Sequence, residues 1–154
     1  MAEVPVRMLI QETAMVLAWV KAGEEITLMK LVRVEAGSDD LADWLDQRIE
    51  MPWVTSTLAE VELPRAVIRT GQLDRLAAIP AVLARLDLFE IDDVVRTTAA
   101  AYQDPHLRSL DAIHLATASV AASIATLAAL VTYDSRLAEA AAALGIPTAA
   151  PGVS

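Results

Sequence analysis

The chain has 154 residues, a formal net charge of −9 at pH 7, no cysteine and a hydrophobic fraction of 55%. Its length favours a single domain that buries its own core. The absence of cysteine excludes disulfides, zinc–thiolate sites and thiol nucleophiles, and it favours a cytoplasmic protein. The acidic charge weighs against binding nucleic acid by broad phosphate neutralisation, although it is compatible with carboxylates gathered around metal ions. No apolar run is long enough to predict a membrane span, and the first residues lack the pattern of a signal peptide.

The N-terminal part of the chain combines several patterns. Residues 4–10 alternate loosely and predict a short strand, whereas residues 11–21 carry apolar side chains at helical spacing and predict a helix. Residues 26–34 satisfy the strand period and the helix period in part, so both assignments stay open there.

From residue 40 onwards, helices alternate with short apolar strands. The predicted helices are 40–48, 57–69, 73–86, 92–102, 109–127 and 135–144, and the predicted strands are 53–56, 86–91, 130–133 and 146–149. Gly145 is the predicted C-terminal cap of the last helix. Strands that alternate with helices of about ten residues or more predict an α/β fold, with a parallel sheet covered on both faces.

Three acidic residues follow the predicted strands at positions that converge in such a fold. Asp134 directly follows a strand, Glu62 lies in the first turns of a helix after another strand, and Asp111 lies in the first turn of its own helix. The carboxyl ends of parallel strands meet at one edge of the sheet, where active sites form. Magnesium is held by one or two carboxylates together with water and phosphate oxygens, and it serves the hydrolysis of phosphodiesters. The pattern therefore predicts a magnesium-dependent phosphodiesterase site.

Each of these residues also has a plainer explanation. An acid in the first turn of a helix, such as Asp111, often interacts only with the helix dipole. Asp134 could serve as an N-cap, and Glu62 could face solvent. His114, three residues after Asp111, is favoured as a packed side chain rather than a catalytic one. Spacing alone leaves these alternatives open.

Four segments of the chain resemble a known family. They are KLVRVEAGSDDLADWL, TSTLAEVEL, LRSLDAIHLATA and LVTYDSRLAEAAAALGIPTAAPG, in this order. From Glu35 to the C-terminus the chain resembles the PIN-domain ribonucleases that act as VapC-type toxins of bacterial toxin–antitoxin pairs. The resemblance implies a three-layer α/β/α fold around a central parallel sheet, Mg²⁺ or Mn²⁺ as cofactor, and RNA as substrate. It also implies a homodimer that binds a cognate antitoxin.

The motifs carry the family's site onto particular residues. Glu62 matches the acidic residue of the second helix, Asp111 that of the LDA motif and Asp134 that of the TYD motif, so the resemblance implies that these three are catalytic and bind the metal. The family also opens with a strand that ends in an aspartate, within LDTSALxK. Counting back from KLVRVE places Glu24 at that aspartate, as a weaker fourth ligand, and a second register places Gln11 there.

The first 27 residues resemble a different family. EVPVR, the ETA segment and AGEEITL are similar to the start of Phd/YefM-type antitoxins. We therefore expect an antitoxin-like segment over residues 1–27 and a PIN domain over residues 28–154 that has an atypical first strand. A frameshift or a misplaced start site is the other explanation of this front. Residues 4–10 or 25–31 could fill the position of the missing strand.

The sequence leaves three candidate functions open. The first is a metal-dependent ribonuclease toxin in which Glu62, Asp111 and Asp134 hold magnesium. The second is a catalytically impaired PIN remnant that lacks the first aspartate and only binds antitoxin or dimerises. The third, a DNA-associated regulator, is disfavoured because the antitoxin-like segment is short and the chain is acidic.

Overall fold

A five-stranded parallel sheet forms the centre of the fold in the computed structural model, which describes residues 15–18, 38–48 and 51–152. The strands are β1 (Met15–Ala18), β2 (Trp53–Ser56), β3 (Asp87–Phe89), β4 (Leu127–Val131) and β5 (Thr148–Ala149). The helices are α3 (Ser38–Asp46), α4 (Ala59–Arg69), α5 (Ile79–Ala84), α6 (Asp93–Ala101), α7 (Ser109–Ile124) and α8 (Ser135–Ala143), with a 3-10 helix at Leu73–Ala78. Among these described residues, no helix is long and apolar enough to cross a bilayer.

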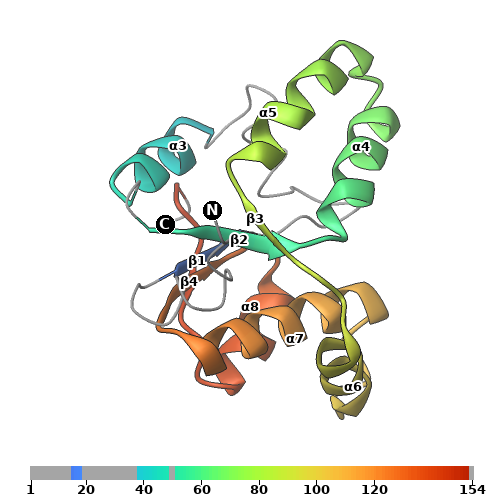
Figure 1. The fold of residues 1–154 in the computed structure, drawn as a ribbon, viewed down its shortest axis with the longest axis vertical. Helices are drawn as coiled ribbons and strands as arrows, with labels where there is room; N and C mark the ends of the chain where they lie inside the picture. The colour runs from blue at the N-terminus through green and yellow to red at the C-terminus, as the bar shows by residue number, and fades with distance from the viewer. Residues whose placement is uncertain (1–14, 19–37, 49–50, 153–154) are drawn as a thin grey trace, which may run out of the picture.

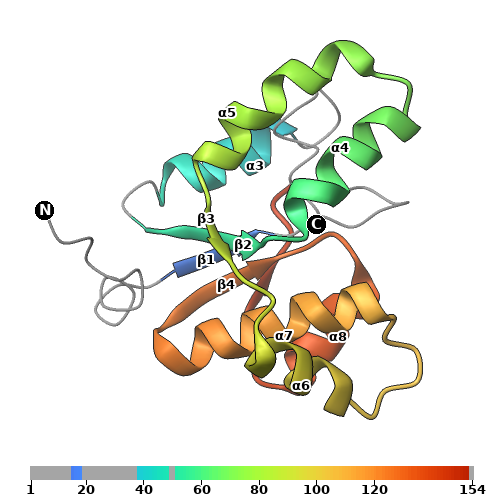
Figure 2. The same cartoon turned by 45° about the vertical axis from the view of Figure 1, so that its right-hand side comes forward.

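The strands are arranged in the order β3-β2-β1-β4-β5, and each neighbouring pair is parallel. Helices α3, α4 and α5 cover one face of this sheet, and α6, α7 and α8 cover the other (Figure 1). The same two helical layers remain on opposite sides of the sheet in the turned view (Figure 2). The predicted α/β fold with a central parallel sheet between two helical layers is therefore confirmed.

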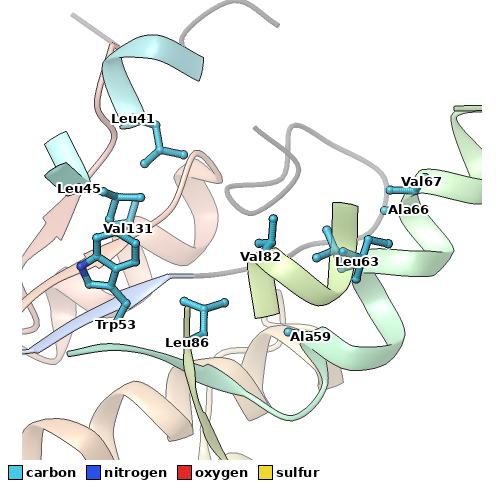
Figure 3. Close-up of a cluster of buried hydrophobic side chains, with 11 residues drawn as sticks. Leu41, Leu45, Trp53, Ala59, Leu63, Ala66, Val67, Val82, Leu86 and Val131 are labelled. Atoms are coloured by element: carbon cyan, nitrogen blue, oxygen red, sulfur yellow. The ribbon is translucent and has the colours of Figure 1, made fainter. Parts of the chain in front are cut away.

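The two faces of the sheet have separate hydrophobic cores. Successive residues of a strand point to opposite faces. Trp53 accordingly packs with the α3, α4 and α5 layer (Figure 3), whereas the next residue, Val54, packs with α7 and α8. On β4, Leu130 and Val131 divide between the two cores in the same way. A sheet that is apolar on both faces requires both layers of helices.

The central strand is the main departure from the predicted elements. The helix predicted over residues 11–21 is wrong at Met15–Ala18, because these residues form β1, which pairs with both β2 and β4. Residues 4–10 and 25–31, proposed for that position, lie outside the described residues, and Met15–Ala18 occupy the position between β2 and β4. The four residues MVLA fit strand and helix equally well by pattern, so the vacant pairing edges of β2 and β4 decide the outcome.

The boundary between α7 and β4 also differs from the prediction. The helix ends at Ile124 rather than at residue 127, and β4 begins at Leu127 rather than at residue 130. The alanine-rich run across this boundary has high helix propensity, but pairing within the sheet overrides that local preference. The strand and the helix predicted for residues 53–56 and 135–144 were placed within one residue of their observed ends.

The helix α8 ends at a glycine with a left-handed backbone conformation, which a substitution can test. Gly145 has φ +75°, and its N–H donates to the carbonyl oxygen of Ala142 while the N–H of Ile146 donates to that of Ala141, each at 3.0 Å. This is the Schellman arrangement, and it requires a left-handed residue. Gly145→Ala is expected to lower the free energy of unfolding by about 1 kcal/mol, measured by urea denaturation. Gly145→Asn should cost less, because asparagine tolerates this conformation. Equal stability of the alanine variant and the wild type would contradict the assignment.

Candidate metal site at the carboxyl edge of the sheet

The three predicted acids lie at the same edge of the sheet. Glu62 is in the helix that follows β2, and Asp134 comes three residues after the end of β4. Asp111 is in the first turn of α7, and the short connection from α7 to β4 places that turn at the carboxyl end of β4. The side chains are buried, with exposed fractions of 6% for Glu62, 6% for Asp111 and 7% for Asp134. The alternative in which Glu62 faces solvent is therefore wrong.

Glu62 and Asp111 are close enough to interact electrostatically. Burial, and then the negative charge of Asp111, raise the pKa of Glu62 from 4.5 to about 8. Both causes oppose ionisation, because a charge loses its hydration and gains a neighbour of the same sign. A cation placed between the two carboxylates would relieve both costs. The pair is therefore an arrangement suited to a cation.

His114 makes a contact with Glu62 that the sequence did not reveal. Its side chain is fully buried on α7, and its Nε2 lies 2.7 Å from Oε2 of Glu62. Burial lowers the pKa of His114 well below 6.5, so the imidazole is neutral at pH 7 beside a largely protonated Glu62. The prediction that His114 is a packed side chain is confirmed by its burial. That prediction did not include the contact with Glu62. The spacing of three residues from Asp111 was the available signal, since it places both on one face of the helix.

Asp134 has a structural role at the start of α8. Its Oδ1 accepts from the backbone N–H of Arg136 at 2.9 Å, and its own N–H donates to Oγ1 of Thr132 at 3.1 Å. The alternative in which Asp134 serves as an N-cap is therefore realised. Within the described ranges, no three histidine, cysteine or acidic side chains are grouped closely enough to hold one metal ion. The structure brings Glu62 and Asp111 together, and Asp134 lies at the same edge outside that pair.

The pair of Glu62 and Asp111 fits a hard divalent cation. Magnesium prefers oxygen ligands and commonly keeps several waters beside one or two carboxylates, so two buried carboxylates are a sufficient protein contribution. Glu24, the weaker predicted ligand, lies outside the described residues, as does Gln11.

Comparison with known proteins gives consistent matches. Residues 27–143 match the PIN domain family. The chain is 63% identical over 129 residues to Ribonuclease VapC35 of Mycobacterium tuberculosis. This alignment covers 84% of the chain and 95% of the relative. The chain is 41% identical over 124 residues to Ribonuclease VapC46 of the same organism, covering 80% and 92%, and 39% identical over 127 residues to its Ribonuclease VapC47, covering 81% and 92%. The chain therefore belongs to the PIN-domain family, within its VapC group.

Proposed function

We propose that this chain is a VapC-type toxin, an endoribonuclease that hydrolyses RNA phosphodiesters with Mg²⁺, or with Mn²⁺ in its place. The observation that carries this proposal is the pair of buried carboxylates, Glu62 and Asp111, at the carboxyl edge of a parallel sheet. The three relatives, which are named ribonucleases, support the choice of reaction.

The three acidic residues would have different roles in such a site. Glu62 and Asp111, once ionised, hold the cation from α4 and α7. A divalent cation held there would supply positive charge to the phosphate oxygens and would lower the pKa of a water molecule. Asp134 adds negative charge at the same edge of the sheet. The hydrogen bond that it accepts from the N–H of Arg136 fixes the orientation of its carboxylate. We retain all three as catalytic residues in this proposal, with Glu62 and Asp111 as the direct ligands of the cation and Asp134 acting on it from the same edge of the sheet.

The partners follow from the same assignment. The substrate is RNA, and the protein is a homodimer that is neutralised by a cognate antitoxin. We further propose that residues 1–27 are an antitoxin-like segment and residues 28–154 the PIN domain. The family match begins at residue 27 and so leaves β1 outside the matched part, although β1 pairs in the middle of the sheet.

The position of β1 outside the part of the chain that matches the family favours a second candidate function, an impaired PIN domain. If the segment that supplies β1 does not deliver the acid that the family carries after its first strand, the chain is an impaired PIN domain. Such a protein would bind antitoxin or dimerise without turnover.

Cleavage of RNA by the purified full chain separates the two candidates. The wild type is expected to cleave with Mg²⁺ or Mn²⁺ and to be inert in EDTA. Asp111→Asn keeps the shape but removes the charge, so it should reduce cleavage by at least about 100-fold. Asp74→Asn, whose side chain is 80% exposed, is the matched control and should cleave like the wild type.

Two outcomes would contradict the ribonuclease assignment. A folded wild type that is inert with both metals supports the impaired remnant. An Asp111→Asn variant that cleaves as fast as the wild type would show that the site lies elsewhere.

A further inference from the structure

His114 connects two helices that lie on opposite sides of the sheet. It is on α7, whereas its partner Glu62 is on α4, and these helices belong to different layers in both views (Figures 1 and 2). The two residues are 52 positions apart in sequence, and the distance from Nε2 to Oε2 is 2.7 Å. A hydrogen bond between the two layers must run past the ends of the strands, which is where the acids lie. The hydrogen bond between His114 and Glu62 therefore lies at the same edge of the sheet as the candidate metal site.

We propose that His114 is a positioning residue that fixes the carboxylate of Glu62 for the divalent cation. This inference rests on the proposed metal-dependent function. His114 does not itself coordinate the cation through Nε2 in this arrangement, because Nε2 is engaged with Glu62. Its effect on the cation passes entirely through the carboxylate.

The chemistry of the pair supports this role. A carboxylate that binds a metal is ionised and can only accept hydrogen bonds, so Nε2 of His114 donates to Oε2 of Glu62 in that state. A free glutamate side chain rotates about three bonds, and binding a metal would then require ordering it. The imidazole is itself held by complete burial, with an exposed fraction of 0%, so it provides a rigid donor. Hydrogen bonds of this kind orient the ligands of metal sites and raise metal affinity.

The test measures Mn²⁺ affinity of the full chain by calorimetry at constant pH. His114→Leu and His114→Asn are expected to weaken Mn²⁺ binding about 10- to 100-fold, because neither places a donor against Glu62. His114→Gln should restore affinity to within a few-fold, since its amide nitrogen reaches the position of Nε2. Thr117→Val is the matched control. Thr117 is also fully buried on α7, but its hydroxyl donates to the carbonyl oxygen of Ile113 at 2.8 Å.

A second measurement separates positioning from a structural role. Urea denaturation in EDTA gives the stability of each metal-free variant. Positioning predicts that Mn²⁺ affinity follows the presence of a donor that reaches Glu62. A structural role predicts instead that affinity follows stability, with Thr117→Val weakened as much as an equally destabilised His114 variant.

The outcomes distinguish this inference from the proposed function. If the wild type binds no Mn²⁺, both are overturned. If the wild type binds Mn²⁺ and His114→Leu and His114→Asn bind it equally well, only the role of His114 is overturned. If the leucine variant does not fold, the asparagine variant decides, because it keeps a polar side chain of similar size that is too short to reach Glu62.

Discussion

Glu62→Gln is expected to abolish metal-dependent RNA cleavage and, at the same time, to make the metal-free protein more stable above pH 8. The loss of cleavage follows because an amide cannot supply the negative charge that holds the cation. The gain in stability follows because glutamine removes a carboxylate that is costly to ionise where it lies. One substitution should thus move activity and stability in opposite directions.

The pH dependence has a definite sign. Glu62 ionises near 4.5 in the unfolded chain, whereas burial and the charge of Asp111 hold its pKa at about 8 in the folded protein. Between these values the folded state binds a proton that the unfolded state has released, so stability falls as the pH rises. The contribution of Glu62 is complete below pH 4.5 and is lost above pH 8, with a size on the order of 5 kcal/mol.

Comparing variants isolates this contribution, because His114 acts in the opposite direction. Burial lowers the pKa of His114 below 6.5, so its contribution to stability is lost as the pH falls below that value. Urea denaturation in EDTA at several pH values should show wild-type stability falling towards pH 8 relative to Glu62→Gln. Glu60→Gln, a change of an exposed carboxylate on the same helix, should follow the wild type. Parallel curves for wild type and Glu62→Gln would contradict the raised pKa.

Leu130→Ala is expected to lower the free energy of unfolding by about 2–5 kcal/mol. Leu130 is fully buried on β4, in the core that packs against α7 and α8. Its neighbours in that core include Val54 and Leu137, which come from β2 and α8, so the cavity would be shared between strands and helix. A loss of this size is a large part of the stability of a typical domain. Thermal unfolding should therefore shift down by roughly 10 °C.

The control for this substitution is Leu73→Ala. Leu73 has an exposed fraction of 59%, so its truncation removes little buried surface and should change stability by about 0.5 kcal/mol or less. If both variants lost the same stability, Leu130 would not lie in a close-packed core.

Most of the fold was predictable from residue 53 onwards, where apolar runs and helical periods alternate strongly. The strand at Trp53–Ser56 and the start of α8 at Ser135 were both predicted correctly, because turn and capping residues bound them. Met15–Ala18 was assigned to a helix, since four apolar residues carry no periodic information of their own. Their strand conformation comes from partners that are remote in sequence.

The site was predictable in its residue types and less so in its contacts. The motifs led to Glu62, Asp111 and Asp134, and all three are buried. The proximity of Glu62 to Asp111, and the hydrogen bond between Glu62 and His114, depend on how α4 and α7 are placed at the edge of the sheet. That placement is a property of tertiary packing between segments about 50 residues apart, which no local pattern contains.

The central place of β1 has a consequence for biosynthesis. β2 and β3 pair across about 30 residues, but Met15 must wait for Leu127, about 110 residues later, before β1 gains its second neighbour. Contacts between such distant residues form slowly and late. We therefore expect β1, the earliest of the described strands in the chain, to be among the last to gain both of its neighbours. The emerging chain then remains without its finished sheet until the residues of β4 have left the ribosome.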